Sequence, residues 1–339
     1  MEQLTDLKAI LHSKRANLYY LEYCRVMQKD GRVLYLTEEK KSNQYWNIPI
    51  ANTTVILLGT GTSITQAAMR MLAQAGVLVG FSGGGGTPLL MATERAIDIE
   101  WFTPQSEYRP TEYIQGWMSF WFDDEQRLQA AKHFQQARID YLQQVWHKDK
   151  ELKQEGFDLS AGQLDDALKR FHERSQAASH QQELLLTEAQ LTKALYKFAA
   201  NRTSTQNFTR QHQASETSQD KANGFLNHGN YLAYGLAATT LWVLGIPHGF
   251  AVMHGKTRRG ALVFDVADLI KDAIVLPWAF ICAKENANEQ EFRQQILQAF
   301  TDHKALDFMF DKVKEVALQR GNKSADWALA KKPKEDTQP

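Results

Sequence analysis

The sequence contains only two cysteines, Cys24 and Cys282, in 339 residues. They are too few for a disulfide framework or a Cys-rich zinc site, and such scarcity is typical of the reducing cytoplasm. Long apolar runs are also absent, because the longest, at about residues 236–246 and 273–282, are well short of the ~20 residues that span a bilayer. The N-terminus lacks the apolar core of a signal peptide. These absences predict a cytoplasmic protein that does not enter a membrane.

An excess of charge of one sign is lacking as well, because 39 Lys and Arg residues balance 39 Asp and Glu residues. A zero net charge argues against a uniformly basic coat for nucleic acid, but it allows a local basic patch. Glycine (20 residues) and proline (8 residues) are too scarce for a collagen-like or low-complexity chain. With 43% hydrophobic residues, the composition is that of a globular protein with about two domains.

The first part of the chain carries the patterns of β-strands. Apolar runs predict five short strands, at residues 18–27, 33–36, 46–50, 55–58 and 77–81. Asp30-Gly31, between the first two runs, is a hairpin signal. Residues 63–75 instead have helical spacing, with Ser63 and Gln66 as an expected capping box. We therefore expect residues 1–100 to form a small β-rich domain.

From about Ala92 onward the spacing of apolar residues is helical. It predicts helices at residues 111–146, 164–174, 181–200, 222–244, 266–282, 290–300 and 307–318, the first of which carries an aromatic stripe typical of a core. Polar residues 202–221 predict a loop, and residues 321–339 predict a disordered tail. The expected fold class is therefore α+β, with a small N-terminal β domain followed by a larger all-α domain over residues 101–320.

Basic residues are concentrated in one part of the helical region. Between Ala189 and Phe264 there are two acids, Glu216 and Asp220, and eight basic residues, which are Lys193, Lys197, Arg202, Arg210, Lys221, Lys256, Arg258 and Arg259. The local excess of six positive charges favours phosphate binding. A solvated basic surface is the alternative interpretation.

A few potential metal ligands lie beside this basic window. Glu188 stands next to an apolar helix face, His254 lies in PHGFAVMHGKTRRG, and Asp265 and Asp268 share a face in FDVADLIKD. Carboxylates together with an imidazole suit Mg²⁺ or Mn²⁺. Simpler roles stay open, because Asp265 is also suited to cap a helix, a lone His is commonly a core residue, and Glu188 could pair with Lys193 or a distant Arg.

The sequence resembles the family of CRISPR-associated protein one, the spacer-acquisition integrase, and looks closest to its subtype I-F form. The match is carried by ITQAAMRMLAQAGVLVGFSGGGG, LTEAQLTKALYKFAA, KANGFLNHGNYLAYGLA and HGKTRRGALVFDVADLIKDAIVLP. The resemblance implies that the β domain forms a homodimer and that the all-α domain is catalytic. It also implies a partner, the small second CRISPR-associated protein, which in this subtype is fused to a helicase-nuclease.

The same resemblance assigns roles to individual residues. Glu188, His254 and Asp268 correspond to the catalytic ligands of Mg²⁺ or Mn²⁺. Residues in supporting positions are Asp265, Asn223, Tyr231 and Lys193, the last of which replaces the Arg of many relatives. The basic residues Lys256, Arg258 and Arg259 are expected to contact DNA.

The function expected from the resemblance is insertion of captured DNA, the prespacer, into a CRISPR array. A 3′-hydroxyl of the prespacer would attack a phosphodiester at the edge of the repeat, with metal assistance. Two alternatives stay open: a metal-dependent nuclease of branched DNA in repair, and a DNA-binding scaffold without catalysis.

Overall fold

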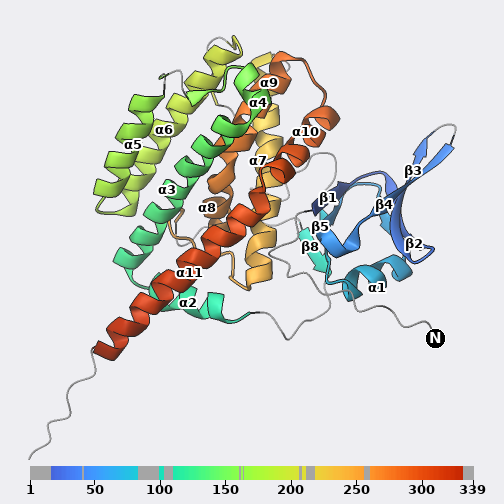
Figure 1. The fold of residues 1–339 in the computed structure, drawn as a ribbon, viewed down its shortest axis with the longest axis horizontal. Coiled ribbons are helices and arrows are strands. Elements are labelled where there is room, and N and C mark those ends of the chain that lie inside the picture. The colour runs from blue at the N-terminus through green and yellow to red at the C-terminus, as the bar shows by residue number, and fades with distance from the viewer. Residues whose placement is uncertain are drawn as a thin grey trace, which may run out of the picture.

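The computed structural model describes residues 17–39, 42–82, 99–102, 110–159, 162, 164–205, 208–210, 218–255 and 260–330. The strands and one short helix gather on one side of the molecule, and the other helices gather on the opposite side (Figure 1). This confirms the predicted fold class, an N-terminal β region followed by a mostly helical region. The predicted boundary near residue 100 falls inside strand β8.

The described part of the β region contains eight strands: β1 (Asn17–Leu21), β2 (Cys24–Lys29), β3 (Arg32–Glu39), β4 (Ser42–Ile48), β5 (Thr53–Leu58), β6 (Ser63–Ile64), β7 (Leu78–Ser82) and β8 (Ile99–Phe102). They form two four-stranded sheets, ordered β1-β5-β7-β8 and β4-β3-β2-β6. In the first sheet β1, β5 and β7 are parallel and β8 is antiparallel to β7. Helix α1 (Gln66–Gln74) buries Ala68 and Leu72 in the core that the two sheets share.

The predicted hairpin at Asp30-Gly31 is confirmed, because both residues have positive φ, of 49° and 71°, and join the antiparallel strands β2 and β3. The single strand predicted at 18–27 is wrong, since the chain turns at Tyr23, whose φ is 49°. The two halves of that run enter different sheets as β1 and β2. A run of apolar residues does not show where the chain passes from one sheet to another.

The predicted capping box at Ser63 is also wrong. Ser63 and Ile64 are extended and pair with β2, which delays the start of the helix. The cap of α1 is Thr65, whose hydroxyl accepts a hydrogen bond of 3.3 Å from the Ala68 N–H.

Strand β5 packs against both halves of the molecule, and it is buried along its whole length. Ile56 and Leu58 point into the core between the sheets. Val55 and Leu57 point the other way and pack with Trp242 and Val243 of the helical region. Burial on both faces explains why residues 55–58 of β5 are all apolar.

The helices of the second region are α2 (Glu112–Trp121), α3 (Asp124–Lys148), α4 (Lys150–Gln154), α5 (Asp165–Ala177), α6 (Gln181–Arg202), α7 (Ser218–Leu244), α8 (Ala261–Ile270), α9 (Leu276–Lys284), α10 (Glu289–Asp302) and α11 (Ala305–Ala330). A π-helical turn, Lys271–Val275, joins α8 to α9. The aromatic stripe predicted to be core is buried at Trp117, Phe120, Phe134 and Tyr141. One helix predicted at 111–146 is in fact two, α2 and α3, with Asp123 capping the second.

The structure differs from two predictions about where the helical region begins and ends. The helical signal from Ala92 does not extend through β8, which pairs with β7 as a strand. Helix α11 continues to Ala330, past the start of the predicted tail at Gly321, while residues 331–339 lie outside the described ones. Among the described helices, none is long and apolar enough to cross a bilayer.

Candidate metal centre

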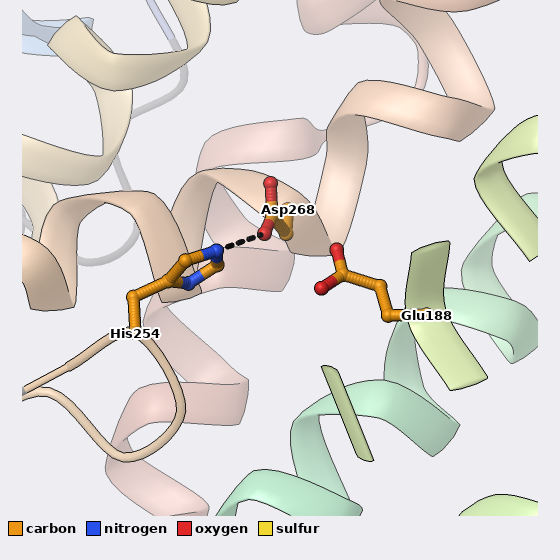
Figure 2. A group of neighbouring side chains, drawn as sticks. All are labelled: Glu188, His254 and Asp268. Atoms are coloured by element: carbon orange, nitrogen blue, oxygen red, sulfur yellow. Dashed lines mark ion pairs between the residues drawn. The ribbon is translucent and has the colours of Figure 1, made fainter. Parts of the chain in front are cut away.

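Three side chains from three separate segments meet inside the helical region. Glu188 comes from α6, His254 from the segment between α7 and α8, and Asp268 from α8, and their polar ends point toward one another (Figure 2). One ligand atom of each lies within 4.8 Å of the others. His254 Nε2 is 3.9 Å from Asp268 Oδ2. The fold thus brings together the three residues that the sequence analysis selected as ligands.

The donor set fits a hard divalent cation. Mg²⁺ binds ligands at about 2.1 Å, which places two opposite ligands roughly 4.2 Å apart. The three ligand atoms already lie near that range, and two carboxylates with one imidazole are donors that Mg²⁺ and Mn²⁺ accept. The geometry and the donor chemistry therefore agree with the cofactor that the resemblance implies.

Asp265 holds the His254 segment in place. Its Oδ2 accepts hydrogen bonds from the N–H groups of Val252 (2.7 Å) and Met253 (3.1 Å). Its Oδ1 accepts from the His254 N–H (3.0 Å) and lies 2.6 Å from His254 Nδ1. A carboxylate at Nδ1 keeps a proton there, so that in the neutral imidazole Nε2 is the nitrogen with the free lone pair.

The alternative in which Asp265 caps a helix is wrong. Helix α8 begins at Ala261 after Gly260, which has a left-handed φ of 66°. Asp265 and Asp268 are therefore buried in the body of the helix rather than at its N-terminus.

Helix α2 supports the same segment from its other side. The indole of Trp117 donates to the Phe250 carbonyl (3.0 Å), and the indole of Trp121 donates to the Ala251 carbonyl (2.7 Å). The tryptophans predicted as core therefore also fix the backbone that carries His254.

Three charged residues of the site were not selected from the sequence: Arg138, Lys271 and Asp272. Arg138 of α3 donates from Nη1 to Glu188 Oε1 (2.7 Å) and from Nε to Asp272 Oδ2 (2.7 Å). Lys271 forms an ion pair with Asp268. The partner of Glu188 is thus a distant Arg, the second of the two options that the sequence left open.

Two signals could have revealed these residues. Arg138 lies four residues after Phe134 and four before Leu142, on the buried face of α3. Lys271 follows Asp268 by three residues, which is the spacing of an ion pair on a helix.

The ionisation of the cluster follows from burial and from these neighbours. Burial raises the pKa of the Glu188 carboxyl, and the Arg138 charge offsets only part of that effect. Burial also opposes ionisation of Asp268, but the positive charges of Lys271 and His254 prevail and lower its pKa. For His254, burial alone would lower the pKa, yet the hydrogen bond to Asp265 and the charge of Asp268 raise it.

The net charge of the cluster suits one divalent ion. Four carboxylates, those of Glu188, Asp265, Asp268 and Asp272, face two permanent cations, Arg138 and Lys271. With a neutral imidazole, these described groups leave two negative charges.

A hollow of about 850 Å³ opens beside Glu188 along α6. Its lining includes Lys193, Lys197 and Arg210 together with the rings of Tyr196 and Phe208. Lys193, predicted to support the site, thus lies on the wall of the hollow that begins at the candidate ligand. Cations interleaved with aromatic rings are typical of surfaces that bind single-stranded nucleic acid.

The remaining predicted residues fall in different places. Asn223 is buried and contacts the Thr209 carbonyl (3.0 Å) and Arg210 (3.2 Å), so it orders one wall of the hollow. Tyr231 packs edge-to-face on Tyr234, whose ring lies 5.3 Å from the Lys271 ammonium. The predicted DNA contacts Lys256, Arg258 and Arg259 lie outside the described residues.

Comparison with known proteins places the chain in a sequence family. The family model of the CRISPR associated protein Cas1 matches residues 18–312. A CRISPR-associated endonuclease Cas1 of Pseudomonas aeruginosa is 58% identical over 95% of this chain and 98% of its own length. A protein of the same name from Pectobacterium atrosepticum is 57% identical over 92% and 95%.

Solved structures share the fold at lower identity. A Cas1 protein from Thermotoga maritima has a TM-score of 0.63 and 16% identity, over 89% of this chain and 97% of that one. A crystal structure of a TtCas1–DNA complex has a TM-score of 0.57 and 20% identity, over 95% of both chains. A casposase bound to its integration product has a TM-score of 0.62 and 16% identity, over 91% of both chains.

Proposed function

The chain belongs to the Cas1 family of CRISPR-associated proteins, and on that premise we propose that it is a divalent-metal-dependent DNA integrase and nuclease. The 3′-hydroxyl of a captured prespacer attacks a phosphodiester at the edge of a CRISPR repeat, and the new P–O bond replaces the bond to the 3′-oxygen of the repeat strand, which leaves as a free 3′-hydroxyl. The observation that carries this proposal is the convergence of Glu188, His254 and Asp268 from three separate segments. Transesterification conserves the number of phosphodiester bonds, so the reaction needs no nucleotide cofactor.

In this proposal Glu188, His254 and Asp268 hold Mg²⁺ or Mn²⁺. The bound ion would supply Lewis-acid polarisation of the phosphate and stabilise charge on its oxygens. Asp265 fixes the imidazole tautomer through Nδ1, which keeps Nε2 available as a ligand. Lys271 keeps Asp268 ionised, which its burial would otherwise oppose.

The hollow beside Glu188 is the proposed path of a DNA strand. Lys193, Lys197 and Arg210 would neutralise phosphates there, and the neighbouring rings would stack on bases. We further propose that Lys256, Arg258 and Arg259 contact DNA next to His254. Partners implied by the family resemblance are a second copy of this chain and the small second CRISPR-associated protein fused to a helicase-nuclease.

A strand-joining assay tests the proposed function. Purified full-length protein is incubated with Mn²⁺ and a branched DNA that carries a free 3′-hydroxyl. Joining supports the integrase, cutting without joining supports a repair nuclease, and no reaction with Mn²⁺ supports a scaffold. For Asp268→Asn we expect joining to fall by more than about 100-fold, because a ligand should matter more than the outer partners that typically cost 10–100-fold.

A matched control separates loss of the ligand from general damage. Asp311 of α11 pairs with Lys314 at the same three-residue spacing as Asp268 and Lys271, and it is solvent-exposed. We expect Asp311→Asn to join DNA like the wild type, and Asp268→Asn to keep DNA binding and its salt dependence. Wild-type joining by a well-folded Asp268→Asn protein would remove Asp268 from the proposed ligands.

A further inference from the structure

Glu188 reaches the site on a flexible side chain, so something has to fix its carboxylate. Of the two carboxylate oxygens, Oε1 accepts a hydrogen bond of 2.7 Å from Arg138 Nη1. Arg138 is itself 3% exposed and lies on α3, fifty residues earlier in the chain. The orientation of Glu188 therefore depends on the orientation of a buried guanidinium.

All three nitrogens of the Arg138 guanidinium donate hydrogen bonds. Its Nε donates to Asp272 Oδ2 (2.7 Å), and its Nη2 pairs with the same carboxylate and contacts Thr192 Oγ1 (3.3 Å). Its Nη1 also contacts Gln135 Oε1 (3.3 Å). A planar fork with five donors can meet these partners at once, whereas a lysine ammonium at the same place has a single centre.

The π-turn presents Asp272 to this guanidinium. Lys271 and Asp272 are consecutive, yet Lys271 pairs with Asp268 and Asp272 pairs with Arg138. Helix α3 also contacts the backbone of the turn, because the Trp146 indole donates to the Ala273 carbonyl (2.9 Å). Single π-helical turns are frequent at functional sites, where they re-aim side chains within a helix.

We propose that Asp272 and Arg138 form a positioning relay that sets the Glu188 carboxylate for metal binding. The inference rests on the proposed function, in which Glu188 is a metal ligand. Arg138 and Asp272 act through Glu188 and are positioning residues. The relay is distinct from simple charge balance, and substitutions that keep the charge tell the two apart.

The experiment measures Mn²⁺ affinity of the full-length protein by electron paramagnetic resonance of free Mn²⁺, with no DNA present. Arg138→Lys keeps the charge but loses the fork, so the relay predicts weaker Mn²⁺ binding by about 10- to 100-fold. Charge balance alone predicts no change. Asp272→Glu keeps the charge but moves the carboxylate, so it should weaken binding as well. Adding it to Arg138→Lys should cost little more, because both substitutions disturb the same relay.

Arg293→Lys is the matched control, because Arg293 forms a partly buried ion pair with Glu22 away from the site. We expect it to lower the melting temperature and leave Mn²⁺ affinity unchanged. If Arg138→Lys does not fold, Asp272→Glu alone decides, since it keeps the charge and an acceptor for Arg138 while shifting the carboxylate by one methylene. Unchanged Mn²⁺ affinity in a folded relay variant would overturn the relay alone, whereas a wild type that does not bind Mn²⁺ would overturn the proposed metal centre and the relay with it.

Discussion

At the scale of single residues, Asp265 links the backbone of the His254 segment to the imidazole. It accepts three backbone N–H groups and faces His254 Nδ1, while being almost fully buried. An amide cannot replace it, because its NH₂ group would meet an N–H donor whichever way it turned. The carboxylate therefore couples the fold of the segment to the chemistry of the imidazole.

We expect Asp265→Asn to lower the free energy of unfolding by about 1–3 kcal/mol, because buried donors lose their acceptor. Loss of the fixed tautomer should also weaken Mn²⁺ binding by about 10- to 100-fold. Urea denaturation and a Mn²⁺ titration measure the two effects. Asp302→Asn, at an exposed aspartate that accepts from Gln298, should change neither. Unaltered Mn²⁺ affinity in Asp265→Asn would contradict the tautomer argument.

How much of the site is predictable depends on sequence separation. Asp265 and Asp268 share a helix, so their spacing placed them on one face, although their position within α8 was misjudged. Arg138 could not be assigned to Glu188, because that contact joins helices fifty residues apart. No local pattern contains such a pairing, and only the packing of α3 on α6 creates it.

At the scale of elements, the close approach of α7 to the π-turn is set by glycine. A Cβ on Gly229 would lie 2.5 Å from Val275 Cγ1 and 3.1 Å from the Phe292 ring. A methyl group there would push the helix away from the segment that carries Asp272. A Cβ on Gly224 of the same helix would meet nothing within 4 Å.

These two glycines give a paired prediction about stability. We expect Gly229→Ala to lower the free energy of unfolding by about 1–3 kcal/mol through overpacking. Gly224→Ala should instead raise it by up to about 1 kcal/mol, because alanine favours a helix more than glycine does. Urea denaturation of both variants provides the test. Equal stabilisation by the two substitutions would show that α7 has room to move.

The elements themselves were mostly visible in the sequence, and the errors have a physical pattern. Long helices such as α6 and α7 followed from the sequence, because α6 packs one face on the core and α7 is largely apolar and buried around its middle. The predictions fail where the chain passes from one packing partner to another within one or two residues. At Tyr23, for example, it leaves the sheet of β1 for the sheet of β2. The π-turn is a similar local change inside a helix. The helical spacing of apolar residues continues through it, so the sequence does not reveal it.

At the scale of the whole molecule, a polar joint ties the β region to the helices beside the apolar contact of β5. Arg293 of α10 donates to Glu22 Oε2 (2.6 Å), just after β1, and its guanidinium lies 4.9 Å from the Tyr20 ring. Its Nε also donates to His228 Nε2 of α7 at 3.4 Å. A histidine that accepts from an arginine is neutral, which makes the joint sensitive to acid.

Burial and the neighbouring Arg293 charge lower the pKa of His228 to about 4. In the unfolded chain the same group takes up a proton below about pH 6.5. Because the unfolded state binds more protons between these values, stability is lost as the pH falls from about 6.5 toward 4. Removing the imidazole should reduce this loss.

We therefore expect His228→Gln to lose about 2 kcal/mol less stability than the wild type between pH 7 and pH 5. The glutamine oxygen can still accept from Arg293, so the joint keeps its hydrogen bond at neutral pH. Urea denaturation at both pH values gives the difference. Identical pH dependence in the two proteins would show that His228 does not govern acid sensitivity.

The packing of α11 on α2 also affects the segment that carries His254. A Cβ on Gly116 of α2 would lie 2.3 Å from the Ala317 carbonyl of α11, so the two backbones are nearly in touch. The next residue, Trp117, grips the segment that ends in His254. Helix α11 thus supports, through α2, the segment that carries His254, and a fusion or truncation that displaces α11 would shift the imidazole although the two do not touch.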